Sequence, residues 1–142
     1  YQDELVVITP NTEKYQELLG KEQKATWIAD ERLIMREEGS GTRKEAEKQL
    51  QNAGIAVESL SVIASIGNQE AIKKSVRQGM GISAMSRLAA EDEIESGRLL
   101  IFPITGASEG RDINLVYNKN YELSRSAERF IRVVKEFYKL KK

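Results

Sequence analysis

Short apolar runs alternate with amphipathic segments along this chain. The runs are rich in β-branched residues and are bounded by Gly, Pro and polar residues, which is typical of strands. The first run is continuous and predicts a strand that is buried on both faces. The expected strands cover residues 5–9, 32–36, 60–66, 82–85, 98–102 and 113–117.

Between these runs, apolar positions recur at helical spacing, and several segments end at a glycine. Thr42 with Glu45 fits a capping box, and Asn68 precedes a further helix as a good N-cap. The expected helices cover about residues 12–19, 43–53, 69–78, 87–94 and 124–140. This alternation predicts an α/β fold, with an open, mostly parallel sheet covered by helices on both faces. Ligands of such sheets bind at the carboxyl ends of the strands.

Composition narrows the possible chemistry. The 142 residues suit one α/β domain, or one domain and a piece of another. Lys plus Arg balances Asp plus Glu at 22 each, so no net positive charge draws the chain to nucleic acid or to an anionic membrane. The chain has no Cys and no His, which excludes thiol nucleophiles, imidazole bases and Cys/His zinc sites. We expect no metal or cofactor, and the absence of His and Cys disfavours an enzyme.

The chain carries no signal for export or for membrane insertion. Its uncharged stretches are about half of the ~20 apolar residues that a spanning helix needs. It opens at Tyr1 without an initiator Met and without a signal-peptide pattern, which predicts either a mature piece or a segment of a longer protein. We expect a cytoplasmic protein with no membrane partner.

The most informative segment is a Gly-rich turn between a strand and a helix, Arg36-Glu-Glu-Gly-Ser-Gly-Thr-Arg43. Its two glycines allow a tight turn and close approach of a ligand. Ser40, Thr42 and the first free N–H groups of the helix present donors at its positive end, which outlines an anion site. The alternative is a purely structural turn, because Ser and Thr are preferred caps. The nearby Glu37, Glu38 and Glu45 oppose anion binding unless they point away.

Three further motifs follow this turn. They are Ser65-Ile-Gly-Asn-Gln-Glu-Ala-Ile72, Val76-Arg-Gln-Gly-Met-Gly-Ile-Ser83, and Glu91 followed by Ser96-Gly-Arg-Leu99. Each motif is common alone. Together, in this order, spacing and strand/helix context, they resemble the second half of the effector-binding domain of LysR-type bacterial transcription regulators. The resemblance covers the chain from Asp3 to about Tyr138.

The resemblance implies a two-subdomain fold like that of type 2 periplasmic binding proteins, with a small-molecule effector in the cleft between the subdomains. The family's N-terminal helix-turn-helix and the first half of its first subdomain have no counterpart in this sequence. We therefore expect about residues 5–110 to form the second subdomain and about 111–142 the closing strand and helix of the first. DNA binding would depend on the missing N-terminal domain. The family's usual His-Pro after the first strand is replaced by Asn11-Thr-Glu-Lys14, which puts the start of the first helix in doubt.

By position, the resemblance places two groups of residues at turns that face the cleft. They are Ser40, Gly41 and Thr42, and Ile66, Gly67 and Asn68. Two adjacent helix N-termini that point at one spot would favour a carboxylate or an oxyanion, so we expect an anionic effector. Arg43 could add a bidentate contact to it. Alternatively, Arg43 pairs with Glu47 one helical turn later and stays in solvent.

The last helix has large apolar side chains on one side. In a complete family member this side should pack on elements that the chain lacks, so we expect it to drive self-association. The residues concerned are Phe130, Ile131, Val134 and Phe137.

Two rival functions remain open at this point. A lobe of a secreted or lipid-anchored solute-binding protein would share the fold and the cleft; a signal peptide in the parent gene would favour it, whereas an upstream helix-turn-helix would favour the regulator. An enzyme using carboxylates and lysines in the cleft is the third possibility. It is disfavoured because no pair of acidic residues lies at two predicted strand ends.

Overall fold

The computed structural model describes residues 1–104 and 110–139, and the chain forms two compact units. The larger unit is Asp3–Arg111, and the smaller consists of Tyr1–Gln2 and Asp112–Lys142. Strands β1 (Gln2–Asp3) and β7 (Arg111–Asp112) pair with each other, and the boundary between the units runs through both.

The larger unit is built on five strands. They are β2 (Leu5–Pro10), β3 (Arg32–Arg36), β4 (Ser61–Ile66), β5 (Ser83–Ser86) and β6 (Leu99–Pro103). Strand β3 pairs with β4 in parallel, and β2 lies between β5 and β6, antiparallel to both. Ile82, directly before β5, bridges Leu33 in parallel and joins the two groups into one layer, in the order β4, β3, β5, β2, β6. The open, mostly parallel sheet that the sequence predicts is confirmed, with β2 as its reversed strand.

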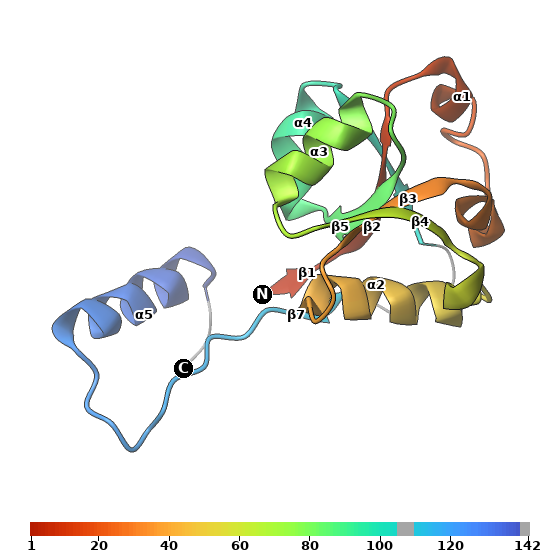
Figure 1. The fold of residues 1–142 in the computed structure, drawn as a ribbon. Helices are drawn as coiled ribbons and strands as arrows, with labels where there is room; N and C mark the ends of the chain where they lie inside the picture. Colours follow the sequence, from red (N-terminus) through yellow and green to blue (C-terminus); the bar gives the residue numbers. More distant parts are fainter. Residues whose placement is uncertain (105–109, 140–142) are drawn as a thin grey trace. The chain divides into compact units, whose positions relative to one another are not determined.

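Helices cover both faces of this sheet (Figure 1). Because successive side chains of a strand point to opposite faces, β2 contributes Leu5 and Val7 to one core and Val6 and Ile8 to the other. The first core is closed by α2 (Gly41–Asn52) and by the 3₁₀ helix η1 (Ala25–Asp30). The second core is closed by α3 (Gln69–Arg77), together with η3 (Leu88–Ala90) and α4 (Glu91–Glu95). All six residues of β2 are buried, as predicted.

This topology places the strand ends at two opposite edges of the sheet. The carboxyl ends of β3, β4, β5 and β6 lie on one edge, together with the amino end of β2, since Leu5 is opposite Ser86 and Arg36 is opposite Ile66. Helices α2 and α3 begin at this edge, directly after β3 and β4. The amino ends of β3 and β5 lie on the other edge with Pro10, the last residue of β2.

Several predicted helices are shorter than their sequence pattern. The helix expected over residues 12–19 is a single turn, α1 (Glu13–Gln16), because only Tyr15 in it is buried and one turn without packing does not extend. The helix expected over residues 87–94 is split into η3 and α4. The capping box at Thr42 is also wrong: Ser40 is the N-cap, and α2 begins at Gly41. Short η2 (Val57–Ser59) leads into β4.

Strand β4 is more exposed than its apolar sequence predicts. Val62 is 41% exposed and Ile63 is 44% exposed. The reason is position, because β4 is at the end of the strand order and, among the residues that the structure describes, pairs with β3 alone. The apolar sequence of β4 therefore correctly predicts a strand but does not predict its exposure.

The smaller unit contains α5 (Arg125–Phe137), whose start at Ser124 is confirmed: the Ser124 hydroxyl accepts a hydrogen bond from Ala127 N at 3.2 Å. The strand expected over residues 113–117 does not form. Ile113 N donates to Tyr1 O at 2.7 Å. Among the described residues, no strand pairs with residues 113–117. The end of the last helix, expected at Leu140, lies outside the described residues.

Candidate functional site

The turn that opens α2 has the geometry of an accessible helix N-terminus. Gly39 has φ +86°, in the left-handed region that favours glycine, and it turns the chain away from β3. The Ser40 hydroxyl accepts from Arg43 N at 3.5 Å, which caps the helix. A Cβ added to Gly41 would meet no atom within 4 Å, so the space in front of this first turn is open.

The turn that opens α3 lies beside the first turn. Asn68 is its N-cap, as predicted, and its Oδ1 accepts from Ala71 N at 3.1 Å. A Cβ placed on Gly67 would be 3.7 Å from Cδ of Glu37, the residue that follows β3. The α3 turn, with Ile66, Gly67 and Asn68, therefore lies next to the segment that leads to Ser40. Among the described residues, no hydrogen bond joins this turn to Ser40 itself.

Arg43 is occupied by protein partners. Its Nε lies 2.8 Å from Glu47 Oε1, which confirms the i, i+4 pair. One terminal nitrogen donates to Arg36 O at 3.1 Å and to Ser65 Oγ at 3.2 Å. Arg43 thus ties the carboxyl ends of β3 and β4 together, and its charge is balanced within the protein.

The acidic residues near the turn are partly neutralised. Glu37 Oε2 accepts from Arg36 Nε at 2.8 Å, and the second oxygen accepts from the same guanidinium at 3.0 Å. This hydrogen bond lowers the pKa of Glu37. Glu45 Oε1 accepts from Gln49 Nε2 at 3.1 Å, so its carboxylate lies along the helix and away from the turn. Only Glu38 is left on the exposed surface without a described partner.

Thr42 joins a buried polar network that sequence reasoning missed. Arg111 donates to Oδ2 of Asp3 from Nε at 2.9 Å, and another of its nitrogens lies 2.8 Å from the same oxygen. A further Arg111 nitrogen donates to Thr42 Oγ1 at 3.1 Å. Ser86 Oγ donates to Asp3 Oδ1 at 2.7 Å, which completes the partners of a carboxylate that is almost fully buried.

This network has a direct consequence for binding. A hydroxyl has one proton to donate and can accept through its lone pairs. Because Thr42 Oγ1 accepts from Arg111, this hydrogen bond does not use the hydroxyl proton of Thr42. Asp3 and Arg111 are 108 positions apart. The signal in the sequence that could have indicated this ion pair is the opposite charge of Asp3 and Arg111, which lie at the two ends of the predicted second subdomain.

Comparison with known proteins covers almost the whole chain. Residues 1–139 match the family model described as LysR substrate binding domain. The chain belongs to this family. The match confirms the resemblance and the expectation of an effector-binding domain of transcription regulators, a family that is not enzymatic.

Curated relatives of this LysR-family chain are longer proteins. It is 35% identical over 103 residues to the RuBisCO operon transcriptional regulator of Allochromatium vinosum, covering 72% of this chain and 33% of that protein. It is 34% identical over 108 residues to the HTH-type transcriptional regulator CbbR of Rhodospirillum rubrum, covering 76% and 35%. The chain thus spans about a third of the length of these relatives. Another match covers only 20% of the phosphonates import ATP-binding protein PhnC of Anaeromyxobacter dehalogenans, too little to carry that name over.

Solved structures of LysR regulatory domains share the fold. The CcmR regulatory domain of Synechocystis PCC6803, in complex with 2-PG, has a TM-score of 0.71 and 28% identity, covering 96% of this chain and 63% of that one. The effector binding domain of QuiR, in complex with shikimate, has a TM-score of 0.75 at 19% identity, covering 96% and 61%. The second likeness concerns the fold alone.

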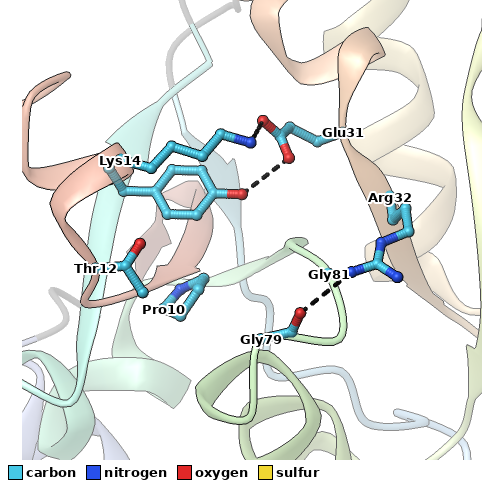
Figure 2. A pocket seen from close by; sticks show the side chains of 8 residues that line it. Pro10, Thr12, Lys14, Glu31, Arg32, Gly79 and Gly81 are labelled. Atoms are coloured by element: carbon cyan, nitrogen blue, oxygen red, sulfur yellow. Dashed lines mark hydrogen bonds and ion pairs between the residues drawn. The ribbon is translucent and has the colours of Figure 1, made fainter.

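The LysR-family chain also contains a cavity of about 230 Å³ on the other edge of its sheet, among Pro10–Tyr15, Glu31–Arg32 and Gly79–Gly81 (Figure 2). It is separate from the predicted site at α2 and α3. Within the described residues, no three His, Cys, Asp or Glu side chains are grouped to hold a metal ion. No helix of the described segments is long and apolar enough to cross a membrane.

Proposed function

We propose that this chain is the ligand-sensing part of a LysR-type transcription regulator, and that its effector is a small anion bound where α2 and α3 begin. The proposed site consists of Ser40, Gly41, Thr42, Ile66, Gly67 and Asn68. One observation carries the proposal: two helix N-termini open at neighbouring strand ends, and the Thr42 hydroxyl in the first turn of α2 accepts from Arg111 without using its own proton. The positive ends of helices and their free N–H groups favour an anion.

The ion pairs near the two turns reduce the local charge that would oppose an anion. Glu37 is paired with Arg36, and Arg43 with Glu47, so neither pair leaves a strong local charge. Arg111 is bound to Asp3 and yet reaches Thr42, which polarises the hydroxyl toward donating to the ligand. We assign Arg111 a positioning role, because Thr42 lies between it and the proposed ligand.

The larger unit is proposed to be the second subdomain, and the smaller unit part of the first. In this account the effector favours one arrangement of the subdomains, and the DNA-binding domain of the parent protein responds by population shift. DNA is contacted only through that N-terminal domain, so the protein acts in the cytoplasm. The CcmR regulatory domain, 28% identical, is bound to 2-PG, which makes 2-PG, inorganic phosphate and sulfate suitable first ligands to test.

The test is calorimetric titration of the chain and of two variants, Ser40→Ala and Thr42→Ala, with these three anions. Each variant should weaken binding, since a lost hydrogen bond costs about 0.5 to 1.5 kcal/mol, or up to ~3 where the ligand is charged. Thermal unfolding serves as the control, because a helix cap alone is worth about 1 kcal/mol of stability. Unchanged affinity with reduced stability would mean that both residues only support the helix.

A further inference from the structure

The cavity on the amino-terminal edge of the sheet is built from three segments that are distant in sequence. Pro10, Thr12 and Tyr15 come from the end of β2 and from α1, and Glu31 and Arg32 from the start of β3. Gly79 and Gly81 come from the turn between α3 and β5 and lie beside Arg32 (Figure 2). This edge is opposite to the one at which α2 and α3 begin, so the cavity is independent of the proposed effector site.

The acidic side of the cavity is internally satisfied. Glu31 forms an ion pair with Lys14 through one oxygen, and its other oxygen accepts from the Tyr15 hydroxyl at 2.9 Å. Burial raises the pKa of Tyr15, and the hydrogen bond to Glu31 and the charge of Glu31 raise it further. The phenol therefore stays protonated and holds Glu31 in place. Lys14, Tyr15 and Glu31 together carry no net charge.

Arg32 is the second cation that lines the cavity, and the charge of Glu31 is already balanced by Lys14. Its guanidinium donates to Gly79 O at 3.4 Å, a long contact with a neutral carbonyl. Among the described residues, it forms no ion pair with a carboxylate. A guanidinium has five N–H donors in a planar fork that matches a carboxylate. In Figure 2 this fork lies at one wall of the cavity, across from Thr12 and Pro10.

The wall that carries Arg32 is rigid. Ile82 N donates to Arg32 O at 2.8 Å, and Ile34 N donates to Ile82 O at 2.8 Å. A Cβ added to Gly81 would approach Arg32 O to 2.5 Å, so this turn packs directly on the start of β3. The backbone of Arg32 and the turn with the two glycines are thus held in a fixed relation, and the guanidinium reaches this turn through its bond to Gly79 O.

We propose that this cavity binds a small organic carboxylate, with its carboxylate on Arg32 and its apolar body against Pro10 and Tyr15. Pro10 and Tyr15 line the cavity, and their rings are the apolar groups of its wall. The volume of about 230 Å³ is below the ~300–1,000 Å³ of sites for drug-sized ligands, so only a small molecule fits. This second site does not depend on the effector site at α2 and α3.

The experiment is an amide NMR titration of the isotope-labelled chain with phenylacetate, with neutral phenylacetamide as the matched ligand control. Phenylacetate should shift the amide signals of Gly79 and Gly81, and phenylacetamide should not. Arg32→Gln should weaken phenylacetate binding by at least about tenfold, because it removes the charged partner. Arg32→Lys, which keeps the charge and loses the fork, should recover part of this loss. Arg87→Gln, an exposed arginine elsewhere, should leave affinity unchanged.

Opposite results would overturn the proposal. They are an unchanged signal at both glycines, equal responses to acid and amide, or Arg32→Gln binding as well as the original chain. The spectra of the variants show directly whether they fold. Shifts at Gly41 and Gly67 alone would support the effector site and reject this one, so the two proposals fail separately.

Discussion

Arg111 approaches Asp3 with two nitrogens, at 2.9 and 2.8 Å from the same carboxylate oxygen, and so joins the strand that enters the larger unit to the strand that leaves it. The Asp3 side chain is 1% exposed and the Arg111 side chain 24% exposed. A buried carboxylate needs such partners, because an unpaired charge in the interior is costly.

Removal of the Asp3 charge should destabilise the larger unit. We expect Asp3→Asn to lower the free energy of unfolding by about 2 to 3 kcal/mol, since a hydrogen bond to a charged group contributes about 1.5 to 3. Urea unfolding measures this. The neighbouring Glu4→Gln is the matched control, because Glu4 pairs with Arg87 in solvent and such pairs contribute about 0 to 1 kcal/mol. Equal losses in the two variants would contradict the assigned role of Asp3.

The buried pair of Lys73 and Glu93 joins α3 to α4, with 3.0 Å between Nζ and Oε2. Burial by itself would raise the pKa of Glu93, but the hydrogen bond and charge of Lys73 outweigh burial and lower this pKa. Burial would likewise lower the pKa of Lys73, but its bonds to Glu70 and Glu93 raise it.

These shifts predict how stability depends on pH. The stabilisation from Glu93 is complete above its ordinary pKa of 4.5 and is lost as the pH falls through the lower folded value. The stabilisation from Lys73 is complete below 10.5 and is lost as the pH rises through the higher folded value. Glu93→Gln should cost about 2 kcal/mol at neutral pH, and less in acid, where the original carboxylate is protonated. Glu70→Gln is the control: Glu70 also contacts Lys73 but is 76% exposed, so a loss as large as that of Glu93→Gln would be unexpected.

Two glycines of the α2 turn should respond differently to alanine. Gly39→Ala should lower stability by about 1 kcal/mol, because its φ of +86° is unfavourable for other residues. Gly41→Ala should fold as well as the original chain, since its Cβ would meet open space. If an anion occupies that space, Gly41→Ala weakens its binding. Thermal unfolding and phosphate titration of both variants provide the measurement, and Gly41→Ala with full affinity would place the ligand elsewhere.

Helix α5 buries none of its side chains fully, and Phe130 and Phe137 are 59% and 76% exposed. An apolar surface of this kind favours association. We expect the chain to self-associate as its concentration rises in sedimentation experiments. Phe130→Ser combined with Phe137→Ser should suppress this, whereas Glu136→Gln on the same helix should not. A monomer at high concentration would refute the expectation.

The sequence predicts those parts of the fold that depend on local periodicity. Strand β3, the cap Asn68 and the start of the last helix are found close to where the pattern places them, because a strand or a helix start is encoded within a few residues. The exposure of Val62 could not be predicted, since an apolar strand can have the same sequence pattern at the edge and in the middle of a sheet.

The candidate site was predictable only in part, for the same reason. Asn68 follows from local capping rules, whereas the same rules place the first cap at Thr42 and the structure has it at Ser40. The bond of Arg111 to Thr42 requires the whole topology, because it joins residues 69 positions apart. The strand expected over residues 113–117 failed because a strand forms only where a partner is available.

The central claim is that an anion binds where α2 and α3 begin, and an amide NMR titration of the chain with inorganic phosphate tests it most directly. The account predicts that the signals of Gly41, Thr42 and Gln69, at the first turns of the two helices, shift together along one binding curve. It also predicts that Thr42→Ala lowers the affinity for phosphate while the signals of the core strands keep their positions. Phosphate that leaves these signals unchanged, or that shifts them equally in Thr42→Ala, would contradict the account.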